Sequence, residues 1–108
     1  MELSELLRFI EIQDARLNRY YSGLEQEKMV LARTVKLAEE LGELCQEVLA
    51  HYSLQSRPKL DSHDKEKLPE EFADVLITTL LLAKSMNVDV EKALERKIQK
   101  INQRFEGI

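Results

Sequence analysis

The sequence predicts an all-α protein, a four-helix bundle that dimerisation completes. Only three glycines and two prolines interrupt its 108 residues, and strand-like alternation of apolar and polar residues is almost absent. The segment 75–83 is apolar almost all the way round, so its own fold and another subunit must enclose it. A chain of this length is expected to form a single domain, residues 1–108.

The first two helices are expected at residues 3–20 and 25–53. In the first, leucine and isoleucine recur at helical spacing, and Gly23 is expected to end it in the left-handed conformation. In the second, an apolar seam is formed by Leu37, Leu41, Leu44 and Val48. Gly42 lies inside this helix at a cost of about 1 kcal/mol relative to alanine. The missing side chain would let either a neighbouring helix or a ligand approach.

The second half of the chain also reads as helical. A polar loop at 54–63 leads to a third helix at 64–86, which has Pro69 in its first turn. Asp89 is a suitable N-cap for a last helix at 90–105. The apolar stripe of that last helix consists of Leu94, Ile98, Ile101 and Phe105.

Composition argues against several functional classes. The net charge is -4 and no block of basic residues stands out, so a nucleic-acid surface is not expected. The one cysteine, Cys45, allows no internal disulfide and is expected to be a buried, inert thiol, and no cluster of His and Cys has zinc spacing. No signal peptide is visible, and the apolar run 75–83 is too short to span a bilayer. We therefore expect a soluble cytoplasmic protein without nucleic-acid or membrane partners.

Two pairs of carboxylates form the candidate site. Glu40 and Glu43 stand three residues apart in the second helix, and Glu71 and Asp74 do so in the third. On a helix this spacing puts both side chains on one face, with Cβ atoms about 5–6 Å apart. Two such pairs on facing helices would repel each other unless a cation lay between them. Mg²⁺ prefers oxygen ligands, so the pattern predicts a Mg²⁺ site.

The carboxylate pairs belong to a longer pattern. The segments Glu39-Glu40-Leu41-Gly42-Glu43 and Glu71-Phe72-Ala73-Asp74 resemble the signature of the MazG-like nucleoside triphosphate pyrophosphohydrolases. The resemblance runs from about Leu31 to Phe105 and implies an all-α bundle that pairs into a homodimer or homotetramer. It also implies Mg²⁺-dependent hydrolysis of an NTP or dNTP to the monophosphate and pyrophosphate, as in nucleotide-pool housecleaning, with Mn²⁺ as an alternative ion.

The resemblance further implies roles for single residues. The metal ligands would be Glu40, Glu43, Glu71 and Asp74. Glu39 would be a weaker catalytic member of the site, and Lys97 and Arg104 would bind the substrate phosphates. Many relatives carry asparagine three residues before the tail arginine, where this chain has Ile101, so the preferred base and sugar stay open.

Other interpretations remain at this stage. The proton of the attacking water could pass to Glu39 or to Glu47. A di-iron or di-manganese carboxylate bundle would need Glu-x-x-His motifs, which the chain lacks. A non-enzymatic dimerisation or regulatory module would have a merely solvated acidic face, and the absence of tryptophan for stacking a base favours it. The basic residues of the last helix could instead form surface ion pairs with Glu91 or Glu95.

Overall fold

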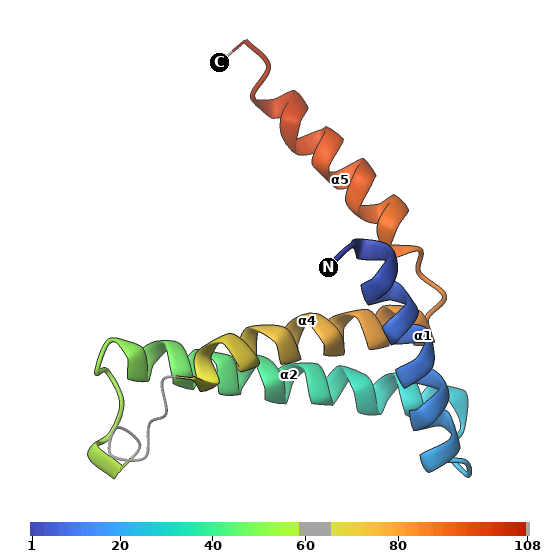
Figure 1. Cartoon of the computed structure of the whole chain (residues 1–108), viewed down its shortest axis with the longest axis horizontal. Coiled ribbons are helices and arrows are strands. Elements are labelled where there is room, and N and C mark those ends of the chain that lie inside the picture. Colours follow the sequence, from blue (N-terminus) through green and yellow to red (C-terminus); the bar gives the residue numbers. More distant parts are fainter. Residues whose placement is uncertain (59–65, 108) are drawn as a thin grey trace.

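The computed structural model describes residues 1–58 and 66–107, and within these ranges the protein is all-α, as predicted (Figure 1). Its helices are α1 (Leu3–Tyr20), α2 (Gln26–His51), α4 (Lys67–Ser85) and α5 (Val90–Arg104). The expected loop after α2 continues into residues 59–65, and His63 lies there, outside the described residues. No helix in the described ranges is both long and apolar enough to cross a membrane.

The antiparallel pair of α2 and α4 is the body of the molecule. Figure 1 shows these two helices side by side, with α1 crossing them near the C-terminal end of α4. Most contacts between helices join α2 to α4, and α1 packs mainly on α4. Helix α5 extends away from the pair, so the four helices named above do not close into a bundle within the described part of one chain (Figure 1).

The helix ends show which local signals were reliable. Pro69 is the third residue of α4, where its missing N–H leaves no hydrogen bond unmade. Asp89 caps α5 as predicted, because its Oδ1 accepts a hydrogen bond of 3.1 Å from the backbone N–H of Lys92. The prediction for Gly23 is wrong. Helix α1 stops at Tyr20, and the left-handed residues of the described ranges are Ser53, Asn87 and Gly107.

The core of one chain is thin. The buried apolar residues of the described ranges are Ile10, Met29, Ala50 and Leu81. In the apolar run 75–83 only Leu81 is buried, whereas Leu76 is 62% exposed. The expected enclosure of this run is therefore met only in part within one chain.

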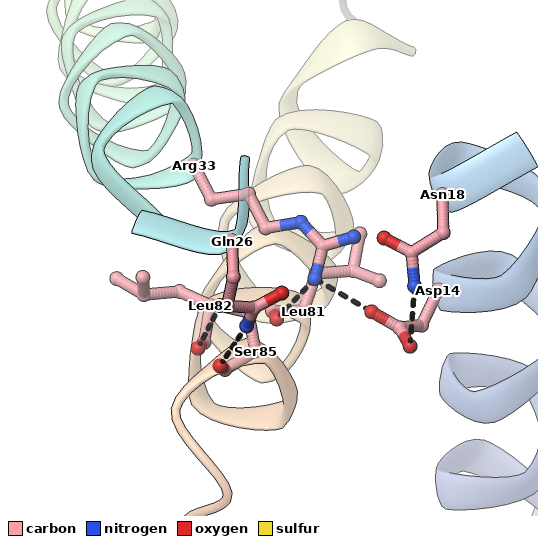
Figure 2. A network of polar contacts seen from close by, with 7 residues as sticks. All are labelled: Asp14, Asn18, Gln26, Arg33, Leu81, Leu82 and Ser85. Atoms are coloured by element: carbon pink, nitrogen blue, oxygen red, sulfur yellow. Dashed lines mark hydrogen bonds and ion pairs between the residues drawn. The ribbon is translucent and has the colours of Figure 1, made fainter. Parts of the chain in front are cut away.

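A polar network ties the three packed helices together at the end of the α2/α4 pair (Figure 2). The Nη1 of Arg33 on α2 donates to Asp14 Oδ1 on α1 at 2.7 Å and to the backbone oxygen of Leu81 on α4 at 3.0 Å. Nearby, Gln26 Nε2 donates to the backbone oxygen of Ser85 at 2.7 Å, which fastens the start of α2 to the end of α4. Removing one partner of a buried ion pair of this kind costs about 3–5 kcal/mol, so Arg33 fixes how the helices meet.

Candidate functional site: an acidic cluster between two helices

Three carboxylates meet across the α2/α4 pair. Glu40 and Glu43 lie one turn apart on α2, and Glu71 comes from α4. Each offers one oxygen, and these oxygens all lie within 4.8 Å of one another. The antiparallel packing of the two helices is what brings residues 28 or more positions apart in the sequence into one cluster.

The cluster is partly withdrawn from water, which makes its charges costly. Glu40 is only 8% exposed. Its Oε1 forms an ion pair with Lys36 Nζ at a distance of 3.2 Å, but its Oε2 is buried without a hydrogen-bond partner. The Oε2 of Glu71 is also buried and unpartnered. Burial of such atoms is unfavourable unless something compensates for the lost water.

The pKa of Glu71 reflects the burial and the negative charge of the cluster. Burial raises the pKa of its carboxyl above the ordinary value, and the negative charges of Glu43, Asp74, Glu40 and Glu47 raise it further in that order. Lys36 is affected in the complementary sense, because its hydrogen bond to Glu40 and the charge of Glu40 raise the pKa of its ammonium group. Lys36 thus offsets part of the negative charge of the cluster.

These residues suit a small divalent cation. Mg²⁺ binds oxygen at about 2.0–2.1 Å in octahedral geometry, so adjacent ligands lie about 2.9 Å apart and opposite ligands about 4.1 Å apart. The oxygens of the cluster lie within 4.8 Å of one another, so rotation of the glutamate side chains would draw them together around one ion. A cation would also give the buried Oε2 atoms of Glu40 and Glu71 the partner that they lack.

The other two predicted acidic residues lie beside the cluster. Asp74 is exposed, one turn further along α4 than Glu71, and it is not one of the three clustered carboxylates. Its charge still acts on Glu71, whose pKa it helps to raise. Glu39 is exposed and forms an ion pair of 3.6 Å with Lys36. Its connection with the cluster therefore runs through the lysine that also binds Glu40.

The structure of one chain does not bring the predicted phosphate ligands to the cluster. Lys97 and Arg104 are exposed residues of α5, which leads away from α2 and α4 (Figure 1). In the described ranges neither forms an ion pair with Glu91 or Glu95, the surface partners considered above. The apolar stripe of α5 is equally uncovered, and Ile98 is 54% exposed.

Some residues at the site were missed or misjudged from the sequence. Arg33 is buried, although it carries a charge, and it lies four residues before Leu37 in the same apolar seam of α2. A charged residue at a seam position was the available signal. Cys45 was expected to be buried, but it is exposed, because no described part of the chain covers that side of α2.

Comparisons with known proteins agree with the motifs. The protein YpjD of Bacillus subtilis (strain 168), named as uncharacterised, is 39% identical over 74 residues, which is 68% of this chain and 65% of that protein. The matched region thus spans slightly less than two thirds of the relative. A crystal structure of YpjD from Bacillus subtilis, there a candidate pyrophosphatase, covers 86% of this chain and 94% of its own, with a TM-score of 0.59 and 30% identity.

A family model supplies the broader assignment. The model described as the MazG nucleotide pyrophosphohydrolase domain matches residues 31–107, a range that includes α2, α4 and the whole acidic cluster. This range is well over half of the chain, so the motif resemblance is confirmed and the chain belongs to the family of MazG nucleotide pyrophosphohydrolase domains.

Proposed function

We propose that the protein hydrolyses a nucleoside or deoxynucleoside triphosphate to the monophosphate and pyrophosphate, with Mg²⁺ as the metal ion. The observation that carries the proposal is the cluster of Glu40, Glu43 and Glu71, in which carboxylate oxygens from two helices lie within 4.8 Å of one another and two of the residues have a buried oxygen without a hydrogen-bond partner. A purely solvated acidic face would not bury Glu40 to 8% exposure beside two further carboxylates. Family membership supports the reaction class.

The roles of the residues follow from their positions. Glu40, Glu43 and Glu71 would hold the ion, and Asp74, one turn from Glu71, would join them as a fourth ligand. Bound there, a divalent cation would supply the positive charge that lets an anionic triphosphate approach four carboxylates. Mn²⁺ also takes oxygen ligands and would be the alternative ion.

Proton transfer needs a carboxylate near the cluster that does not ligate the ion. Glu47 is partly buried on α2, one turn beyond Glu43, and its charge is felt by Glu71. Glu39 is held in an ion pair by Lys36. We therefore assign the acceptance of the water proton to Glu47, and to Glu39 the task of holding Lys36 beside Glu40.

Assembly would complete the site. We propose a homodimer or homotetramer, because Lys97 and Arg104 project on an isolated helix whose apolar stripe is uncovered in one chain. Packing of that stripe against another subunit would bring basic side chains over an acidic cluster. Arginine would grip phosphate oxygens in a bidentate way, and lysine would act as a point charge.

A nucleotide panel tests the function. Incubation with Mg²⁺ and each triphosphate should release pyrophosphate and the monophosphate, and Glu40→Gln or Glu43→Gln should lower kcat by about 100-fold or more while the protein stays folded. The matched control is Glu70→Gln, an exposed glutamate beside Glu71, which should retain activity. Absence of pyrophosphate with every nucleotide would favour the regulatory module, and activity only with bound, light-absorbing iron would favour the carboxylate bundle.

A further inference from the structure

Lys36 is the basic residue that the described part of the chain places against the acidic cluster. Its Nζ lies 3.2 Å from Glu40 Oε1 and 3.6 Å from Glu39 Oε2. Glu39 was assigned above to hold this lysine beside Glu40. None of the roles assigned above belongs to the ammonium group itself.

Helix stabilisation explains the ion pair of Lys36 with Glu40 poorly. Lys36 precedes Glu40 by four residues, and a lysine that follows the glutamate would stabilise a helix better. The exposure of the two partners is also unequal, because the side chain of Lys36 is 57% exposed and that of Glu40 is 10% exposed. Ion pairs with a solvated partner contribute little to the stability of a fold. The lysine can therefore leave Glu40 at little cost.

Lys36 lies where the helix pair leads from the cluster toward an open pocket of about 370 Å³ between α1, α2 and α4. Both Lys36 and Thr78 line this pocket. On α2, Lys36 comes one turn of about 5.4 Å before Glu40, and on α4, Thr78 comes one turn after Asp74. Because the two helices are antiparallel, both steps lead in the same direction (Figure 1). An ammonium group and a hydroxyl group therefore follow the carboxylates along the helix pair.

A triphosphate that binds to an ion at the cluster needs further positive charge. It brings several negative charges to a place where carboxylates already crowd, and one divalent cation leaves an excess of negative charge. Lys97 and Arg104 lie on α5, which leads away from the cluster within one chain (Figure 1). Phosphates that extend from the cluster toward the pocket would instead pass the ammonium group of Lys36.

The distances allow the ammonium group to pass from a carboxylate to a phosphate. Around an octahedral Mg²⁺, adjacent ligand oxygens lie about 2.9 Å apart. A phosphate oxygen that ligates next to Glu40 would therefore lie close to Lys36 Nζ, which is 3.2 Å from Glu40 Oε1. The open pocket beside the lysine leaves room for its flexible four-carbon stem to turn.

We propose that Lys36 binds a phosphate oxygen of the triphosphate, and that it exchanges Glu40 for this oxygen when the nucleotide arrives. The inference rests on the proposed function and adds a substrate-binding residue from the same chain that supplies the metal ligands. Before the nucleotide binds, Lys36 offsets the charge of Glu40 and so opposes a divalent cation. Loss of its charge therefore has opposite effects on two ligands, since Mg²⁺ alone binds more tightly and the triphosphate binds more weakly.

Calorimetric titration measures the two effects separately. Lys36→Met removes the ammonium group and keeps an unbranched side chain of similar helix propensity. Mg²⁺ alone should bind this variant about threefold more tightly than the wild type, because a positive charge beside Glu40 is gone. Inorganic triphosphate, a probe without a base, should bind it about tenfold or more weakly in saturating Mg²⁺, the usual loss of one charge-assisted hydrogen bond.

Two further variants control for net charge and for the side chain. Lys28→Met removes the same charge from an exposed position of α2, and it should leave both dissociation constants within about twofold of the wild type. Lys36→Arg keeps a cation that can bind phosphate, and its triphosphate affinity should stay within about threefold. Weaker triphosphate binding by Lys36→Met with unimpaired Mg²⁺ binding supports the inference. Weakening of both, as expected for a lysine that only supports the fold, or unchanged triphosphate binding overturns it.

A measurement on the wild-type protein needs no variant. Amine acetylation followed by mass spectrometry of peptides reports how readily each lysine reacts. Inorganic triphosphate added in the presence of Mg²⁺ should slow the reaction of Lys36 by about fivefold or more, because an ammonium group bound to phosphate holds its proton more tightly. The reaction of Lys28 should not change. If melting curves show that Lys36→Met is unfolded, this comparison decides alone, and equal rates for Lys36 with and without triphosphate overturn the inference.

Failure of the proposed function is read separately. If the nucleotide panel shows no hydrolysis, the binding of inorganic triphosphate still decides about Lys36. If nucleotides are hydrolysed but inorganic triphosphate does not bind, the KM of the hydrolysed nucleotide replaces it and should rise about tenfold in Lys36→Met. An unchanged KM, or the absence of both hydrolysis and binding, overturns the inference.

Discussion

Glu71 shows, for a single residue, that the negative charge of the cluster is unfavourable in the folded protein. Its carboxyl is raised in pKa by burial and by its acidic neighbours, so the folded protein binds this proton more tightly than the unfolded chain does. The stabilising contribution of the proton is present below the ordinary pKa and is lost as the pH rises through the raised value. At neutral pH the ionised Glu71 therefore lowers the free energy of unfolding.

Glu71→Gln should for this reason stabilise the metal-free protein at neutral pH, by on the order of 0.5 kcal/mol, the size of a relieved like-charge contact. The gain should shrink as the pH falls toward the ordinary carboxyl pKa. Melting curves in a chelator, and again with added Mg²⁺, measure both effects, because the variant should also lose the upward shift of Tm that the ion gives the wild type. Glu70→Gln, exposed on the same turn, is the control and should follow the wild type. A lower Tm for metal-free Glu71→Gln would contradict this account.

The site residues divide by whether one helix or several helices determine their environment. Glu40 and Glu43 were predictable because a spacing of three on a single helix already fixes a shared face. Their meeting with Glu71 required only that two amphipathic helices pack as neighbours. The buried state of Arg33 depends on α1, α2 and α4 together, through Asp14 and the backbone oxygen of Leu81, and no local pattern contains that information.

At the scale of elements, helix ends were predictable where one side chain decides them. Asp89 caps α5 through its own carboxylate, and the fixed ring of Pro69 suits the first turn of α4. Gly23 failed as a signal because glycine permits the left-handed conformation without requiring it, and Tyr21 already closes α1 with a backbone hydrogen bond of 2.9 Å to Leu17. Helix α5 has no extensive contact with the other described helices, so its local sequence contains no signal for its direction.

Gly42 offers a test of what approaches α2. A Cβ built on it would meet no described atom within 4 Å, so close packing inside one chain does not explain the glycine. Gly42→Ala should raise the free energy of unfolding by about 1 kcal/mol, because alanine is the better helix former and no atom obstructs it. Urea denaturation measures this change. Loss of turnover in a stabilised Gly42→Ala protein would show that a ligand or another subunit comes close to this position, whereas lower stability would mean that the surface is already occupied.

The chain is more extended than a compact domain of its length. Its radius of gyration is 17.2 Å, whereas a compact domain of this length has about 13 Å. Large apolar residues are exposed along both helices of the central pair: Leu31, Val35 and Leu41 on α2, and Phe72 and Leu76 on α4. Many large apolar residues exposed on two neighbouring helices are unusual on a monomer, and such surfaces are typical of interaction sites.

We therefore expect a stable dimer or larger assembly at low micromolar concentration, with α4 at the contact. Leu76 is the sharpest probe, because it is 62% exposed and contributes little to the core of its own chain. Leu76→Lys would place a charge in the buried contact and should shift sedimentation toward the monomer. Glu70→Lys introduces the same side chain elsewhere on α4, and it should leave the assembly intact. A wild-type protein that sediments as a monomer would contradict the assignment of this surface.

If Leu76→Lys lowers turnover in proportion to the monomer formed, the active site needs the second subunit, as the remote position of Lys97 and Arg104 on α5 implies.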